Sequence, residues 1–186
     1  MKIAWIAPLM MLARLYAADV TVYVAADNSA AIYPAQSVAS GMFRQAGVSV
    51  AWRPGTPRPK ALSGPVIPIE LAAKTPPERS PDALAVAYPY SGAARGITVF
   101  YDRIRRRAGR DANLERALLA HVLVHEITHV LEGVDRHSET GVMKAHWSAE
   151  DYAAMAVRPL PFDETDLILI AHSRLLHSDQ KPLPVR

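Results

Sequence analysis

Cysteine is absent from this sequence of 186 residues. The chain therefore forms no disulfide, and it has neither a thiolate metal site nor a cysteine nucleophile. Beyond the N-terminus no stretch reaches the roughly 20 apolar residues that a membrane helix needs, and no internal repeat or low-complexity tract occurs. Hydrophobic residues make up 50% and charged residues 21% of the chain, which argues against a disordered or fibrous protein. A globular fold of this chain must be stabilised by its hydrophobic core and by the prolines in its loops.

The N-terminal segment predicts an export signal. Lys2 supplies a positive charge, an apolar run follows over residues 3–12, and Ala17 and Ala18 offer small residues for cleavage. The alternative is a buried N-terminal strand or helix. We expect residues 1–18 to be a signal peptide and the protein to be secreted or periplasmic, with no membrane span left after the signal is removed.

The charge of the chain is nearly balanced. The whole sequence carries a formal net charge of +3, from 21 basic and 18 acidic residues. Removal of residues 1–18 takes away two basic residues, Lys2 and Arg14, and no acidic one, so the charge falls to near +1. Such a small charge gives little attraction to a polyanion. We expect no nucleic-acid partner, and we expect a monomer.

Strand and helix patterns alternate along the rest of the chain. Runs of β-branched and aromatic residues predict strands at Val20–Ala25, 48–53, 66–71, 84–88 and 97–101. Apolar residues at helical spacing and capping signals predict helices at 34–46, from 111 or 113 to about 131, from 148, and from 162 or 163. This order predicts an α/β layer followed by a smaller, mostly irregular and helical part.

The longest predicted helix carries His125, Glu126 and His129. Two histidines four residues apart project from the same helix face, which suits two nitrogen ligands on one tetrahedral zinc ion. Glu126 stands beside the first histidine, where its carboxylate can reach a zinc-activated water without binding the metal itself. The pattern predicts Zn²⁺ as cofactor and a hydrolytic site.

The sequence around this helix resembles the metzincin clan of zinc peptidases. Residues 125–137 read HEITHVLEGVDRH, and a turn containing methionine follows at 141–144; metzincins read H-E-x-x-H-x-x-G-x-x-H, with a methionine turn beneath the metal. The His-Ser pair at 137–138 is similar to the matrixin branch. The resemblance implies zinc binding, Glu126 as catalytic base and Met143 as the floor of the site.

The spacing after the second histidine departs from the metzincin motif. Gly133 comes one residue late and His137 two residues late, while Asp135 stands where the third histidine would fall. We favour His137 as third ligand because neutral imidazole is a strong zinc ligand and Gly133 permits a sharp reversal of the chain. Loop length is also less constrained than helix spacing. Asp135 is the alternative.

The resemblance implies a zincin-like α+β fold with a twisted mixed sheet of four to five strands, two long helices and a small C-terminal subdomain ending in a helix. Residues 19–186 are expected to form one catalytic domain, with an upper subdomain over 19–133 and a lower subdomain over 134–186. The expected activity is that of a secreted zinc-dependent endopeptidase, which hydrolyses a protein or peptide substrate with Glu126 as general base.

Two other functions stay open. A gluzincin-type peptidase would keep both helix histidines and take a downstream glutamate, Glu150 or Glu164, as third ligand. A non-catalytic exported protein would use the same scaffold for zinc binding or for an interaction. The intact Glu126 argues against the second alternative, because a structural zinc site needs no base.

Several neighbouring residues carry weaker expectations. The strand at 84–88 takes the position of the edge strand that pairs with extended substrate in metzincins. His121 is expected to be a buried or supporting residue rather than a fourth ligand, because catalytic zinc keeps one position for water. Transition-state support is expected from His146 or Tyr152. The arginines between 103 and 110 are expected on a solvated loop and helix start.

Overall fold

The computed structural model describes residues 19–25, 30–57, 65–88 and 96–178 of the chain. The predicted signal peptide at 1–18 lies outside the described residues. In the part of the chain that the structure describes, no helix is both long and apolar enough to cross a membrane.

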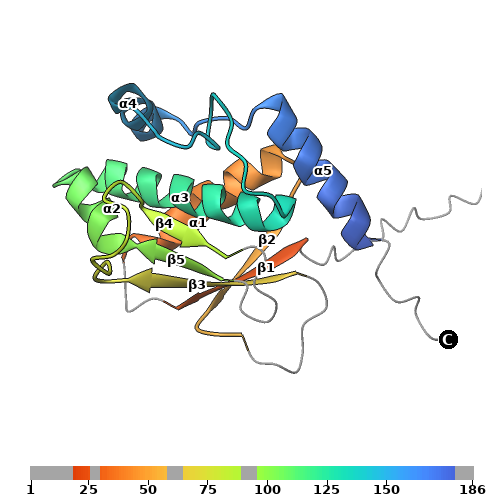
Figure 1. Cartoon of the computed structure of the whole chain (residues 1–186), viewed down its shortest axis with the longest axis horizontal. Coiled ribbons are helices and arrows are strands. Elements are labelled where there is room, and N and C mark those ends of the chain that lie inside the picture. Colours follow the sequence, from red (N-terminus) through yellow and green to blue (C-terminus); the bar gives the residue numbers. More distant parts are fainter. Residues whose placement is uncertain (1–18, 26–29, 58–64, 89–95, 179–186) are drawn as a thin grey trace, which may run out of the picture.

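A five-stranded mixed sheet forms one layer of the molecule, as the sequence predicted (Figure 1). Its strands lie in the order β2-β1-β3-β5-β4. The first four are parallel, whereas β4 runs antiparallel to β5 at the edge. The strands are β1 (Val20–Ala25), β2 (Val50–Pro54), β3 (Val66–Ala72), β4 (Ala85–Ala87) and β5 (Ile97–Phe100).

Helices α1 (Ile32–Gln45) and α3 (Ala112–Glu132) pack on the same face of this sheet (Figure 1). The core lies between them and the sheet, because β-branched residues at alternate strand positions point toward the helices. Its members include Val20, Val22, Ile67, Ile69, Met42, Phe43, Leu119 and Leu123. Every residue of α3 from 117 to 125 is buried, which places this helix between two layers rather than on the surface.

Both ends of α3 are fixed by the residues that the sequence indicated. The Asp111 carboxylate accepts hydrogen bonds from the backbone N–H groups of Asn113 and Leu114, at 2.9 and 3.0 Å, and so caps the first turn. Gly133 ends the helix in the left-handed conformation, with φ of 67°. Its N–H donates to the His129 carbonyl at 2.9 Å. The chain therefore reverses directly after the helix turn that carries His129.

The last two helices, α4 and α5, lie on the side of α3 away from the sheet (Figure 1). α4 (Ala149–Val157) begins at the predicted capping box, in which Ser148 and Asp151 each bind the other's backbone N–H. α5 (Glu164–Ser178) begins within two residues of the predicted start and packs against α3. The segment between α3 and α4 contains neither a helix nor a named strand.

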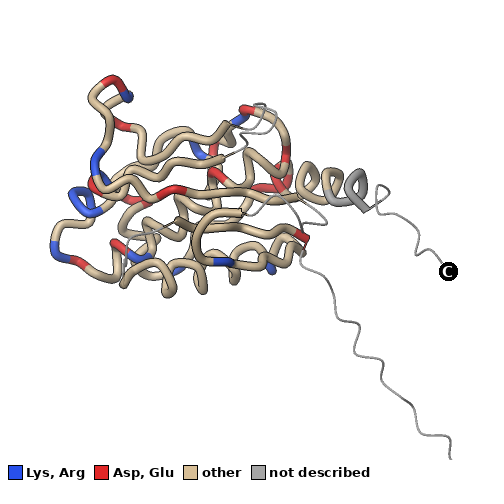
Figure 2. Tube along the Cα trace, turned by 90° about the horizontal axis from the view of Figure 1, so that it is seen from below, with Lys and Arg blue, Asp and Glu red and all other residues tan. Residues whose placement is uncertain are grey.

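The prediction for the arginine-rich segment was wrong in part. The chain passes from β5 directly into a short helix, α2 (Tyr101–Ala108), rather than through a loop. Ile104 and Ala108 are buried one turn apart and dock this helix. Arg103 is half-buried, and its guanidinium donates to the carbonyls of Ala83, at 2.6 Å, and Ser80. Basic and acidic residues are otherwise interspersed along the trace (Figure 2).

Candidate metal centre

Three histidine side chains converge beside the C-terminal half of α3. His125 and His129 come from the helix, and His137 comes from the loop after Gly133. Their candidate ligand atoms all lie within 4.8 Å of one another. The ring centroids are 4.7 Å apart for His125 and His129, 5.2 Å for His125 and His137, and 4.9 Å for His129 and His137. The loop thus brings His137 to the two helix histidines.

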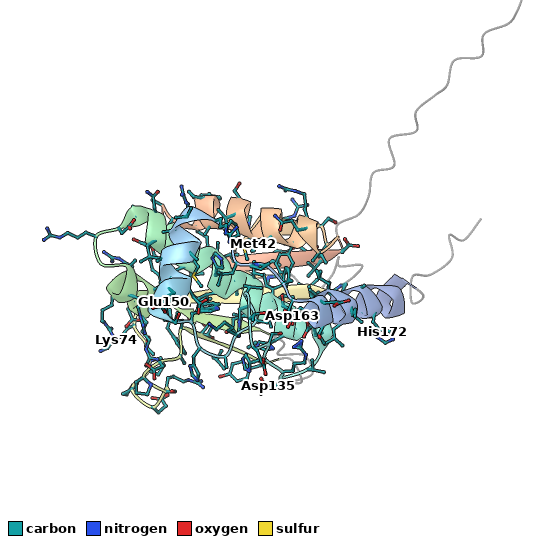
Figure 3. The ribbon with its side chains drawn as sticks, turned by 90° about the horizontal axis from the view of Figure 1, so that it is seen from above. Met42, Lys74, Asp135, Glu150, Asp163 and His172 are labelled. Atoms are coloured by element: carbon teal, nitrogen blue, oxygen red, sulfur yellow. The ribbon has the colours of Figure 1, made fainter. Side chains whose placement is uncertain are left out.

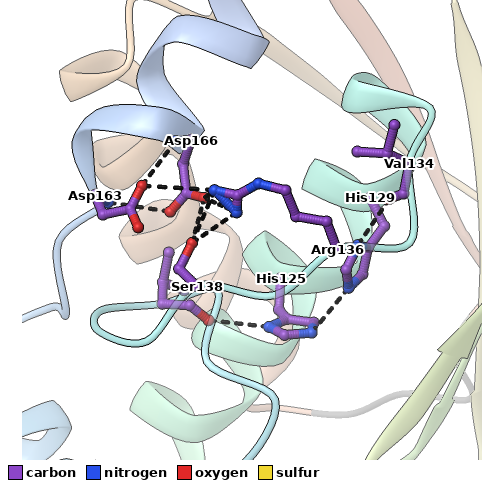
Figure 4. Close-up of polar contacts among 8 residues, drawn as sticks. His125, His129, Val134, Arg136, Ser138, Asp163 and Asp166 are labelled. Carbon is purple, nitrogen blue, oxygen red and sulfur yellow. Dashed lines mark hydrogen bonds and ion pairs between the residues drawn. The ribbon is translucent and has the colours of Figure 1, made fainter.

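Backbone carbonyls fix the tautomers of the two helix histidines (Figure 4). Nδ1 of His125 lies 2.9 Å from the Val142 carbonyl oxygen, and Nδ1 of His129 lies 3.2 Å from that of Val134. A carbonyl oxygen only accepts, so each Nδ1 carries the proton and each neutral ring keeps a lone pair on Nε2. The two Nε2 atoms face each other at 3.1 Å. Two lone pairs in this position can bind one cation together.

The donor set fits zinc. Burial lowers the pKa of His125 to about 3, and burial together with the neighbouring His137 lowers the pKa of His129. Both rings are therefore neutral at physiological pH, as a metal ligand must be. Zn–N bonds of 2.0–2.1 Å in a tetrahedron put two ligand nitrogens about 3.3 Å apart. The observed 3.1 Å between the two Nε2 atoms is close to this value.

The other candidate ligands lie outside this cluster. Asp135, Glu150 and Glu164 are exposed, and none of them belongs to the histidine group. Figure 3 shows Glu150 on α4, well apart from Asp135 and from Asp163 at the start of α5. The geometry therefore offers the two helix histidines a third imidazole rather than a carboxylate.

Glu126 lies beside the histidines and its pKa is strongly shifted. Burial is the main cause, the charge of Asp135 adds to it, and together they raise the pKa of Glu126 to about 7. A backbone hydrogen bond from Ala87, on edge strand β4, opposes the rise. A carboxyl group with a pKa close to neutrality can both take up and release a proton at physiological pH.

The methionine turn passes beneath His125. Gly141 has φ of 75°, and a Cβ at this position would lie 2.2 Å from the Pro161 carbonyl oxygen, so only glycine fits. The turn brings the Val142 carbonyl to His125 and buries Met143 completely. The Met143 carbonyl accepts the Ser138 N–H at 2.8 Å. The turn is thereby joined to the residue that follows His137.

His121 lies one turn before His125 and has no free nitrogen for a metal. Its Nδ1 donates to the Ala117 carbonyl at 2.6 Å, and its Nε2 accepts the Leu160 N–H at 2.9 Å. The ring is fully buried and meets the edge of Trp147. His121 therefore joins α3 to the segment that leads into α5.

A cleft of about 440 Å³ opens beside the histidines. Its lining includes residues 80 and 82–85, which lead into edge strand β4, and residues 144–147. The lining also includes Arg107, Val122, His125, Glu126, His137 and Tyr152. A larger cavity, of about 1040 Å³, lies near Tyr33 and Arg53 and contains none of the three histidines.

Known proteins support the fold assignment through structure alone. No protein-family model matches the sequence, and no curated protein matches it. Among solved structures the chain is similar to archaemetzincin from Methanopyrus kandleri, with 14% sequence identity and a TM-score of 0.56. The match covers 83% of this chain and 94% of that one. At this identity the likeness shows the fold, and the protein has the zincin-like α+β fold that the sequence predicted.

Proposed function

We propose that this protein is a zinc-dependent peptidase in which His125, His129 and His137 hold the metal. The observation that carries the proposal is the convergence of the three imidazoles, two of which turn unprotonated nitrogens toward each other at 3.1 Å. The structural similarity to archaemetzincin also supports this function, because that protein is named after the metzincin clan that the sequence motif resembles. Glu126 is the catalytic base.

The metal and the Glu126 side chain would supply different parts of the reaction. Zinc, when bound, supplies a Lewis acid that polarises the scissile carbonyl and lowers the pKa of a water molecule. The Glu126 carboxylate takes the proton of the attacking water and returns it to the nitrogen of the leaving amine. The amide bond breaks in one hydrolytic step, because the mechanism needs no side-chain nucleophile.

The cleft favours an extended peptide as substrate. β4 lies at the edge of the sheet, and the residues that lead into it line the cleft beside Glu126. Backbone groups on an edge strand can pair with an added strand, which holds a peptide without need of particular side chains. His146 and Tyr152, the two candidates for transition-state support, line the same cleft. Export after removal of residues 1–18 and a monomeric state are further parts of the proposal.

The test of this function is Glu126→Gln in the full chain. We expect the variant to retain one zinc per chain while cleavage of a broad peptide library falls by a factor of at least about 100, because the base is lost and the ligands are kept. The matched control is Glu150→Gln, an exposed acid on α4, which should keep both zinc and activity. Wild-type cleavage by Glu126→Gln would contradict the assigned base. Zinc-loaded wild-type protein that cleaves no peptide would contradict the peptidase.

A further inference from the structure

The three histidines of the cluster are held in different ways. His125 and His129 are 8% and 6% exposed, and each donates its Nδ1–H to a backbone carbonyl. His137 is exposed, and its ring has no hydrogen-bond partner among the described residues. Metal-binding histidines normally have such a partner to orient the ring. Its ring contacts the rings of His125 and His129, and the polar contacts that hold this segment come from the residues on either side of it.

Both neighbours of His137 bind the same carboxylate oxygen (Figure 4). The Arg136 guanidinium donates to Oδ1 of Asp166 through Nη2 at 2.9 Å and Nη1 at 3.2 Å. The Ser138 hydroxyl donates to that same Oδ1 at 2.7 Å, and it accepts from both Arg136 nitrogens, at 2.9 and 3.1 Å. His137 is thus the middle residue of three, and both flanking side chains end on Asp166.

Asp166 is itself held in a fixed place. Its side chain is fully buried, and its second oxygen, Oδ2, accepts the Asp163 N–H at 3.0 Å. The Asp163 carboxylate accepts the Asp166 N–H in return, at 2.8 Å, so the two residues cap the first turn of α5 reciprocally. Further along α5, the Ser173 hydroxyl donates to the Leu131 carbonyl at the end of α3. The carboxylate therefore has a defined position relative to the helix that carries His125 and His129.

We propose that Asp166, on the last helix, is the positioning residue that places His137 in the metal centre. The inference rests on the proposed metal site. Loss of the Asp166 charge removes the nearer ion-pair partner of Arg136 and leaves it the Asp163 carboxylate at 3.7 Å. Both oxygens of Asp166 accept hydrogen bonds, and an asparagine amide has only one accepting atom, so Asp166→Asn loses the bonds to one side of the carboxylate. Substitution of a residue that orients a metal ligand typically weakens metal binding by about 10- to 100-fold. α5 thereby contributes to metal affinity although none of its described residues belongs to the histidine cluster.

The experiment measures zinc affinity by chelator competition and records the visible spectrum of the cobalt-loaded full chain. The variants are Asp166→Asn, which removes the charge at constant shape, and His137→Ala, which removes the ligand. Asp151→Asn is the matched control, because Asp151 holds the same capping position in α4 and also pairs with a cation, Lys144. We expect about 10- to 100-fold weaker zinc binding for Asp166→Asn and a cobalt spectrum shifted toward that of His137→Ala. Asp151→Asn should bind zinc like the wild type.

The outcomes separate this inference from the proposed function. If His137→Ala weakens zinc binding and folded Asp166→Asn binds like the wild type with an unchanged cobalt spectrum, the positioning role is wrong and the metal site stands. If His137→Ala binds zinc as tightly as the wild type, the metal site itself is wrong. Should Asp166→Asn fail to fold, Ser138→Ala and Arg136→Gln each remove one arm of the contact. Wild-type zinc affinity in both would overturn the inference.

Discussion

The candidate metal centre combines two regions of different construction. In the helix half, α3 sets His125, Glu126 and His129 at a fixed spacing, and caps at both ends define where the helix starts and stops. In the loop half, residues 134–144 contain no helix or named strand and are held by contacts with α3 and α5. Regular backbone geometry fixes the first half, whereas individual tertiary contacts fix the second.

The dependence between the two halves runs in both directions. The loop supplies the carbonyls of Val134 and Val142 that fix the tautomers of the helix histidines. The helix in turn ends at Gly133, whose left-handed conformation directs the chain back toward the site. A site built in this way needs the loop even for the two histidines that the helix supplies. Substitutions in either half test this division.

Loss of one histidine ligand should weaken zinc binding more than any other change. The factor should be similar for a histidine of the helix half and for His137 of the loop half. His129→Ala and His137→Ala are each expected to weaken zinc binding by roughly 1,000-fold, since each ligand contributes about a third of a binding free energy of about 12 kcal/mol. The control is His146→Ala, which removes an exposed histidine of the same cleft. Chelator competition measures all three. Unchanged affinity in His137→Ala would remove the loop from the metal centre.

Gly133, which ends the helix half, and Gly141, in the loop half, should differ in their tolerance of a side chain. Gly141→Ala is expected to cost about 3 kcal/mol or more, because the new Cβ meets the Pro161 carbonyl oxygen at 2.2 Å in addition to the strain of a positive φ. Gly133→Ala should cost about 1–2 kcal/mol, since a Cβ there meets no described atom within 4 Å. Urea unfolding of the metal-free protein measures both.

A third glycine supplies the control for this comparison. Gly55 also has a positive φ, of 83°, a Cβ there would meet no described atom within 4 Å, and the residue lies outside the histidine cleft. Gly55→Ala should cost as much as Gly133→Ala and leave zinc affinity unchanged. An equal loss of unfolding free energy in Gly141→Ala and Gly133→Ala would mean that the turn can move away from Pro161. That result would contradict a loop held in one position by its contacts.

The smallest effect is expected at Glu132, the last residue of α3, where the two halves meet. Both of its carboxylate oxygens are buried and without a hydrogen-bond partner among the described residues. Burial, with the nearby Asp166 adding to it, raises the pKa of Glu132 to about 7. The folded state therefore binds a proton more tightly than the unfolded state, and stability is lost as the pH rises from about 4.5 through 7.

Glu132→Gln removes this cost of ionisation. At pH 8 the variant should be more stable than the wild type by about 1 kcal/mol, and the gain should vanish below about pH 4.5, where both states of the wild type are protonated. Urea unfolding of the two proteins at pH 8 and pH 4.5 measures the difference. A gain that is the same at both pH values would contradict the assigned ionisation.

Local signals predicted the helix half, whereas for the loop half the sequence favoured His137 over Asp135 but did not indicate which contacts hold the loop. The i and i+4 spacing of His125 and His129, the cap at Asp111 and the stop at Gly133 are local signals, so the sequence alone placed them correctly. The path that brings His137 rather than Asp135 to the cluster depends on Asp166, 28 residues beyond Ser138. Contacts between residues so far apart leave no local pattern.

The fold shows the same contrast. The strands were predicted because buried β-branched residues alternate along them, as at Val20 and Val22. Helix α2 was missed because it has only eight residues, with two buried positions, Ile104 and Ala108, among its arginines. So short an amphipathic pattern is easily mistaken for a loop.

The most direct test of the account is the coordination sphere of zinc in the full chain, measured by X-ray absorption at the zinc edge with one equivalent of metal. We predict three imidazole nitrogens at about 2.0–2.1 Å together with one oxygen ligand. His137→Ala should lose one of the three imidazoles. Two imidazoles with a carboxylate in the wild type, unchanged in His137→Ala, would contradict the claim that the loop supplies the third histidine.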